Sequence, residues 1–256
     1  MTRSYVVTGG GGEIGRAIVE RLLREGDVVV ALDAHPDALA WIDDHPAVHR
    51  LIGVAGDATD ERVTIEAADR AKLAAPLVGW VNNAARFQDA TIHDTPTGDV
   101  MGAISTNIEL AVVGCATAIR HFLVTGIAGA IVNVSSHQAR RAVPGSLPYS
   151  TAKAAIEGLT RALAVDYGAN EIRVNAVAPG TIVTARYEDD IRRLGPKVGG
   201  RIDRETRRLH ALERVGLPEE VADVVAFLLS SDAGFISGAT VPIDGGRSVL
   251  GREPLP

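Results

Sequence analysis

The stretch TGGGGEIGRAIVERLLREG, residues 8–26, sets a cluster of glycines between a β-rich run and a segment of helical periodicity. We predict a buried strand at Tyr5–Thr8 before it and a helix at Ile14–Glu25 after it. Gly9, Gly11 or Gly12, and Gly15 allow a tight turn whose backbone can approach a pyrophosphate, with the positive end of the helix dipole facing that anion. Alone, such a loop predicts only a strand–helix turn, so its meaning depends on its context.

The same strand–helix rhythm continues through nearly the whole chain. Further strands are predicted at Val28–Leu32, Val48–Val54, Leu77–Val81, Ala130–Val134, Arg173–Val177 and Thr240–Ile243. Further helices are predicted at Asp60–Ala74, Asp99–Val124, Tyr149–Tyr167 and Pro218–Ser230, with Gly26 and Gly168 as stops. Alternation with doubly buried strands predicts an α/β fold: a Rossmann-type, doubly wound parallel sheet of about seven strands with helices on both faces, in one domain spanning residues 1–256.

Composition excludes several classes of protein. A chain of 256 residues with 46% hydrophobic residues suits one compact domain, and a net charge of −6 argues against a nucleic-acid-binding surface. Cys115 is the only cysteine, so disulfides are not expected. Met1-Thr2-Arg3 leads straight into a predicted strand, and no apolar run approaches the roughly 20 residues that span a bilayer. We expect a cytoplasmic chain with no nucleic-acid or membrane partner and no metal site.

Asp33 closes the second predicted strand, in VVVALDAHPD. A carboxylate there can accept hydrogen bonds from both adenosine ribose hydroxyls and would repel a 2′-phosphate. No arginine or lysine follows at Ala34 or His35. The sequence therefore favours NAD over NADP.

Tyr149 and Lys153 lie four residues apart on a predicted helix, which puts a phenol beside an ammonium group. A fixed positive charge favours the ionised phenol, whose ordinary pKa is about 10. Tyr149 could then act as an acid/base near neutral pH. The spacing occurs by chance in many helices, but Ser136, thirteen residues before the tyrosine, adds a polar partner.

An ordered series of motifs resembles the single-domain branch of the short-chain dehydrogenase/reductase family from Tyr5 to about Gly246. The motifs are TGGGGEIG (8–15), GDATD (56–60), NNAA (82–85), Asn107, NVSS (133–136), Tyr149 with Lys153, IRVNAVAPG (172–180) and PIDGG (242–246). One match would mean little, but the ordered set makes coincidence very improbable.

The resemblance implies a catalytic tetrad of Asn107, Ser136, Tyr149 and Lys153. Tyr149 would exchange a proton with the substrate oxygen, and Lys153 would bind the nicotinamide ribose and lower the tyrosine's pKa. Ser136 would donate to the same oxygen and stabilise developing charge. Asn107 would anchor a water that links Lys153 to solvent.

The resemblance also implies the cofactor contacts. Asp57 and the Ala58 backbone would hold the adenine, and Ile182 and Thr184 the nicotinamide carboxamide. The full expected cofactor set is Gly9, Gly11, Gly12, Glu13, Ile14, Asp33, Asp57, Ala58, Asn83, Ala84, Ala85, Tyr149, Lys153, Pro179, Gly180, Ile182 and Thr184. The expected substrate set is Ser136, Gln138 and Tyr149, with His137 open between a substrate contact and none.

Two residues depart from the family pattern. Glu13 and Ala85 each stand where the family usually has glycine. A carboxylate at Glu13 is unfavourable beside a pyrophosphate unless its side chain points to solvent, so we expect altered cofactor affinity. Ala85 is a small, harmless replacement. Ser135, next to the catalytic serine, is expected to be a hydrogen-bonded loop residue.

Residues 185–215 correspond to the family's variable substrate lid. The segment carries nine Arg/Lys against six acidic residues. One interpretation is an anionic substrate clamped by a lid arginine, or by Arg140 or Arg141. The other is a solvated amphipathic helix, which is the more common use of such a pattern.

The sequence thus predicts an oxidoreductase that transfers a hydride between NAD(H) and a secondary alcohol or ketone. An NADPH-dependent carbonyl or 3-oxoacyl reductase is the alternative that Asp33 disfavours, and a catalytically silent NAD-binding regulator or scaffold is the alternative of another class. The Tyr149–Tyr167 helix is apolar or small around most of its circumference, which predicts a second covering surface. We expect a homotetramer, or a homodimer.

Overall fold

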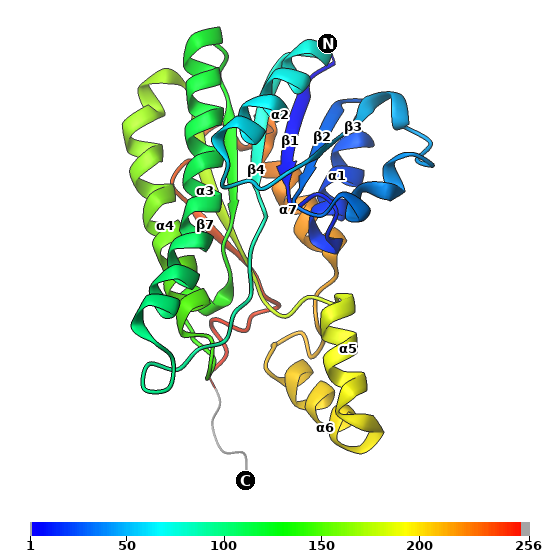
Figure 1. Cartoon of the computed structure of the whole chain (residues 1–256), viewed down its shortest axis with the longest axis vertical. Coiled ribbons are helices and arrows are strands. Elements are labelled where there is room, and N and C mark those ends of the chain that lie inside the picture. The colour runs from blue at the N-terminus through cyan, green and yellow to red at the C-terminus, as the bar shows by residue number, and fades with distance from the viewer. Residues whose placement is uncertain (1, 252–256) are drawn as a thin grey trace.

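Seven parallel strands form one sheet in the order β3-β2-β1-β4-β5-β6-β7 (Figure 1). The structure, a computed structural model, describes residues 2–251. The strands are β1 Ser4–Thr8, β2 Val28–Asp33, β3 Leu51–Ala55, β4 Leu77–Asn82, β5 Ala130–Val134, β6 Arg173–Pro179 and β7 Thr240–Ile243. This confirms the predicted doubly wound sheet. Its order reverses between β1 and β4, the switch point where such sheets bind ligands.

Helices cover both faces of the sheet, so the molecule has three layers (Figure 1). On one face lie α1 Glu13–Leu23 and α7 Pro218–Leu229, which pack against each other. On the other lie α2 Glu61–Ala74, α3 Thr97–Thr125 and α4 Leu147–Tyr167. Because alternate strand residues face opposite sides, Val7 joins the first core and Val6 the second.

Short 3₁₀ turns supply most of the remaining connections. They are η1 Pro36–Ile42, η2 Val48–Arg50, η3 His137–Ala139, η4 Gly168–Asn170 and η5 Ser231–Ala233. The predicted strand at Val48–Val54 was therefore wrong at its start, where Val48 is half exposed in η2 and strand pairing begins at Leu51. Gly168 keeps a right-handed φ of −60°, and the left-handed residue that ends this helix region is Glu171.

Helix α3 is long and apolar enough, by length and composition, to cross a membrane. The expectation that no segment approaches that length was therefore wrong. Leu110, Cys115 and Ile119 on α3 are buried in the core beneath the sheet. Burial in the core accounts for part of the apolar length of α3.

The segment expected to form the substrate lid, residues 185–215, contains two helices, α5 Ala185–Arg193 and α6 Gly195–Arg208, and is called the lid below. They project beyond the carboxyl ends of the strands, at the edge of the sheet where the glycine loop also lies (Figure 1). Tyr187 joins them by donating its hydroxyl to Asp203 at 2.7 Å. Gly199 is the one buried residue of these two helices. Because they contribute so little to the core, their sequence lacks the apolar pattern of the other helices.

Candidate active site

The glycine loop between β1 and α1 is shaped for close backbone approach. Gly9 has a φ of +65°, which glycine adopts without strain. A Cβ at Gly15 would lie 1.9 Å from the Gly9 carbonyl oxygen, so α1 can begin this close to the turn only with glycine there. The first turn of α1 has no side-chain cap, and its N–H groups suit an anion such as a pyrophosphate.

Asn83 holds this turn from the neighbouring strand. Its amide nitrogen donates to the carbonyl oxygens of Thr8 and Gly9, both at 3.1 Å. The backbone N–H groups of Asn83 and Ala84 donate to the Thr8 hydroxyl, also at 3.1 Å. The Asn83 side chain therefore supports the glycine turn. The expected contacts of residues 83–85 with the cofactor would have to come from their backbone.

Asp33 lies at the same loop. Its two carboxylate oxygens accept from the Gly11 N–H at 3.1 Å and the His35 N–H at 3.0 Å. A Cβ on Gly11 would come within 2.6 Å of Ala38, so η1 packs directly on the loop. The carboxylate is thus fixed at the place where an adenosine ribose would meet the glycines.

Asp57, at the end of β3, has both oxygens bonded. One accepts from the Thr59 backbone and hydroxyl at 2.9 Å, and the other from the Arg86 guanidinium at 2.7 Å. These bonds hold the pKa of Asp57 below its usual range, with the Thr59 N–H as the largest cause. Ala58 beside it is buried. Sequence reasoning missed Arg86, the first residue after the NNAA motif.

Ser136, Tyr149 and Lys153 converge at the carboxyl end of β5, and all three are buried. The Lys153 ammonium donates to the Val134 carbonyl oxygen at 2.7 Å and lies 5.4 Å from the centre of the Tyr149 ring. Ser136 accepts from the Gln138 N–H at 3.2 Å, which orients its hydroxyl.

The prediction that Tyr149 has a lowered pKa was wrong for the protein alone. Burial raises the pKa of Tyr149 to about 12, although the Ser136 hydroxyl and the charge of Arg186 act in the opposite direction. Burial also lowers the pKa of Lys153 to about 8. The sequence predicted correctly that the two side chains are neighbours. It did not reveal that both are buried, and burial disfavours the charged form of each.

Ser135 is hydrogen-bonded to this cluster, whereas Asn107 is hydrogen-bonded to the Arg86 backbone and within its own helix. Ser135 donates to the Lys153 carbonyl oxygen at 3.2 Å, which confirms its expected role as a hydrogen-bonded residue. Asn107 accepts from the Arg86 N–H at 2.9 Å and donates to the carbonyl oxygens of Arg86 and Ala103 at 2.9 and 3.1 Å. One lone pair of its amide oxygen remains for a water.

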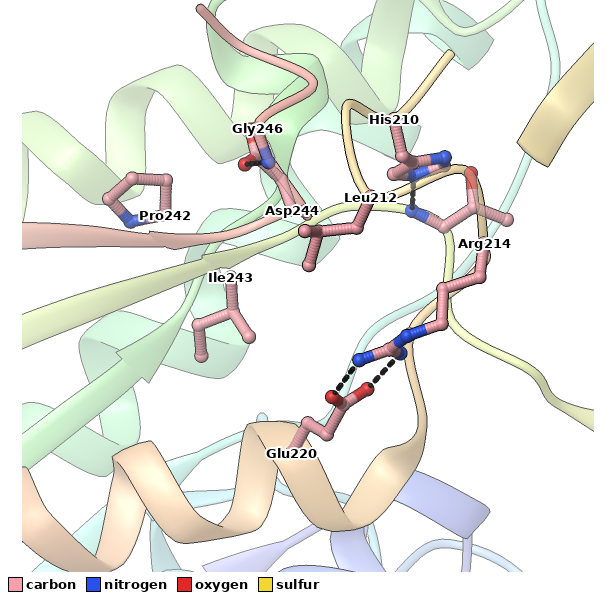
Figure 2. Close-up of a pocket in the computed structure, with 11 residues that line it drawn as sticks. His210, Leu212, Arg214, Glu220, Pro242, Ile243, Asp244 and Gly246 are labelled. Atoms are coloured by element: carbon pink, nitrogen blue, oxygen red, sulfur yellow. Dashed lines mark hydrogen bonds and ion pairs between the residues drawn. The ribbon is translucent and has the colours of Figure 1, made fainter. Parts of the chain in front are cut away.

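The loop after β6, Pro179–Thr184, is bonded from several elements. The His137 ring donates through Nδ1 to the Pro179 carbonyl oxygen at 3.2 Å, and the Gly180 N–H donates to the Ile243 carbonyl oxygen at 2.9 Å. His210, buried at the end of the lid, accepts from the Thr181 N–H at 3.2 Å (Figure 2). The loop expected to hold the nicotinamide is therefore rigidly placed.

A cavity of about 210 Å³ lies behind this loop, between the end of β7 and the lid's return (Figure 2). Its charged side chains are already paired, since Arg214 and Glu220 form a double hydrogen bond at 2.6 and 2.8 Å. Asp244 accepts from the N–H groups of Gly246 and Ser248 at 2.9 and 2.7 Å. Ser136, Tyr149 and Lys153 do not line this cavity, so it is separate from the catalytic cluster.

Glu13 is exposed, but its carboxylate is not free. Its carboxylate accepts the backbone N–H of Ala185, the first residue of the lid helix α5. Ile14 behind it packs against the core. Thr184 caps the same helix, because its hydroxyl accepts the Tyr187 N–H at 3.2 Å, while Ile182 is buried. The carboxylate that replaces the family's glycine thus connects the glycine loop to the lid.

Together, the uncapped helix behind a glycine turn, Asp33 beside it and the Ser136–Tyr149–Lys153 cluster define an oxidoreductase that uses a nicotinamide cofactor. The family model described as Enoyl-(Acyl carrier protein) reductase matches residues 11–248. The chain belongs to the short-chain dehydrogenase/reductase family, whose members act on CH–OH groups or the corresponding carbonyls.

Curated relatives and solved structures match along almost the full chain. The 2-(R)-hydroxypropyl-CoM dehydrogenase of Xanthobacter autotrophicus is 32% identical, over 98% of this chain and 100% of the relative. Meso-2,3-butanediol dehydrogenase of Serratia marcescens is also 32% identical, over 97% and 96%. The aldohexose dehydrogenase of Thermoplasma acidophilum has a similar structure, with a TM-score of 0.86, 30% identity and coverage of 100% and 97%.

Proposed function

We propose that this chain is an NAD-dependent dehydrogenase that interconverts a secondary alcohol and its ketone, with residues 185–215 as the substrate lid of a single domain. The observation that carries the proposal is the convergence of Ser136, Tyr149 and Lys153 at the carboxyl end of β5, on the same edge of the sheet as the glycine loop after β1. Bound NAD would accept or return the hydride, while the protein supplies placement and proton transfer. Formation of NADH from NAD and an alcohol tests the proposal.

Tyr149 would take the hydroxyl proton of the alcohol, and Ser136 would donate to the same oxygen. Since burial raises the pKa of Tyr149 to about 12, its action as a base needs nearby positive charge. Lys153 would supply part of that charge and hold the nicotinamide ribose. Asn107 would anchor the relay water; it lines a cavity of about 90 Å³ that Lys153 does not line.

Asp33→Ala should shift the cofactor preference from NAD toward NADP. Asp33 is fixed at the glycine loop, where its charge would oppose a 2′-phosphate. Because like charges in contact cost several kcal/mol, we expect the kcat/KM ratio of NADP to NAD to rise at least about tenfold. Steady-state kinetics with both cofactors measure it. Asp43→Ala, which removes an exposed acid at the end of η1, should leave the ratio unchanged; an equal shift there would contradict the assignment.

For the substrate, the relatives' names favour a small polar secondary alcohol. Those relatives are named as dehydrogenases of a butanediol, an aldohexose and 2-(R)-hydroxypropyl-CoM. The alternative is an anionic substrate bound by an arginine of the lid. Ion pairs within the lid, such as Arg193 with Asp190 at 3.3 Å and Arg207 with Asp203 at 2.8 Å, favour the solvated-helix interpretation for most of its arginines.

We further propose a cytoplasmic homotetramer. Helix α4 leaves an uncovered stripe that includes Ala154, Ala155, Ala162 and Val165, and Val165 is 81% exposed. Residues of α3, which packs against α4, add exposed apolar surface such as Val124. Light scattering at micromolar concentration should give four times the mass of the chain. A monomeric mass would contradict the proposed assembly but would leave the catalytic proposal unaffected.

A further inference from the structure

An aromatic stack joins the lid to the catalytic tyrosine. Phe87 lies in the segment after β4, and its ring stacks on the Tyr149 ring with centroids 4.6 Å apart and planes inclined by 28°. The guanidinium carbon of Arg186 lies 4.2 Å from the centre of the Phe87 ring. Arg186 is the second residue of α5, so the first turn of the lid reaches the catalytic tyrosine through one side chain.

The backbone around Arg186 is held from two sides. Glu13 accepts the N–H of the residue before it, and the Thr184 hydroxyl accepts the N–H of the residue after it at 3.2 Å. The ion pair of Arg186 itself, with Asp190, is long at 3.9 Å and half exposed. The backbone bonds fix the start of α5, and the guanidinium itself lies on the Phe87 ring.

Arg186 supplies a kind of charge that Lys153 does not. The charged groups that face Tyr149 are Lys153 on its own helix and Arg186 on the lid. Lys153 has a pKa lowered to about 8 by burial, so its charge fades above that pH. A guanidinium stays charged throughout the working range of an enzyme. The charge of Arg186 lowers the pKa of Tyr149, against the larger effect of burial.

We propose that Arg186 and Phe87 are positioning residues for the catalytic tyrosine: the first turn of the lid orients the Tyr149 ring through Phe87 and sets a permanent positive charge beside it. This inference rests on the proposed function, because it takes Tyr149 as the proton-transfer group. An opening lid would withdraw the charge of Arg186 from Phe87 and Tyr149, while Phe87, which lies outside the lid, would lose the guanidinium that packs on its ring. Proton transfer would then depend on lid position.

The pH dependence of kcat/KM for alcohol oxidation tests the charge. In Arg186→Gln, the limb that rises with pH should move up by about half a pH unit, because an opposite charge near the phenol has been removed. Arg186→Lys should restore most of the original position. Arg70→Gln removes a comparable exposed arginine, paired with Glu66 on α2, and should leave the profile unchanged. An unmoved limb in Arg186→Gln would overturn the electrostatic part.

Fluorine NMR on protein labelled with fluorotyrosine tests the geometry without turnover. The Tyr149 resonance is assigned by its loss in Tyr149→Phe. It should shift in Phe87→Leu, which keeps an apolar side chain but removes the ring, and in Arg186→Gln, but not in Arg70→Gln. An unchanged resonance in both stack variants would overturn the positional part. Since this readout needs no substrate, it separates failure of this inference from failure of the proposed function.

Discussion

Replacing Tyr149 with phenylalanine should lower turnover by about a thousandfold or more, because proton transfer by a positioned side chain typically contributes 10²–10⁴-fold. The change removes one oxygen from a buried ring and leaves the glycine loop, Asp33 and Lys153 in place. NADH binding should therefore survive. Initial rates of NADH formation measure the first effect, and fluorescence titration with NADH measures the second.

Tyr167→Phe is the matched control, since it makes the same change on the same helix at the end far from the cluster. It should keep normal turnover. Retained turnover in Tyr149→Phe would show that another group moves the proton. Loss of NADH binding in that variant would show instead that the tyrosine is part of the cofactor site alone.

Lys153→Met should abolish turnover and, at the same time, change how stability depends on pH. Lys153 is 2% exposed, and burial lowers its pKa from 10.5 to about 8. Between these two values the unfolded chain binds a proton that the folded chain does not. Lys153 should therefore make a contribution to the free energy of unfolding of the wild type that rises with pH from about 8 upward, by up to about 1.4 kcal/mol per unit. Methionine has no proton to bind, so this rise should be missing.

Urea unfolding at pH 7, 8 and 9 measures this difference in slope. The loss of the bond to the Val134 carbonyl oxygen lowers stability equally at each pH, so it does not affect the comparison. Lys72→Met, on the exposed side of α2, should keep the wild-type slope. Parallel slopes for wild type and Lys153→Met would contradict a buried, partly neutral lysine.

Much of the fold followed from local pattern. The strand at Ala130–Val134 was predicted at its observed bounds, because a short β-branched run buried on both faces has few alternatives. The polar residues that follow the strands come together because parallel strands share one carboxyl edge. The spacing of Tyr149 and Lys153 predicted their proximity because residues four apart on one helix share a face.

What the sequence did not reveal depends on contacts between distant segments. Glu13 and Ala185 are 172 residues apart, and no periodicity predicts that one binds the other. Phe87 belongs to no motif, and only the packed structure shows it on Tyr149. The raised pKa of Tyr149 was missed for a similar reason, since burial is a property of the assembled layers and outweighs the nearby charges.

The central claim is that this chain carries out hydride transfer with its own tyrosine as the acid/base. The most direct test is NADH formation from NAD by the wild type across a panel of sugars, polyols, hydroxy acids, steroids and cyclic alcohols, beside Tyr149→Phe under the same conditions. The account predicts NADH with at least one secondary alcohol in the wild type and almost none in the variant. Tight NADH binding with no turnover on any member, with NAD or NADP, would contradict it and indicate a silent cofactor-binding protein.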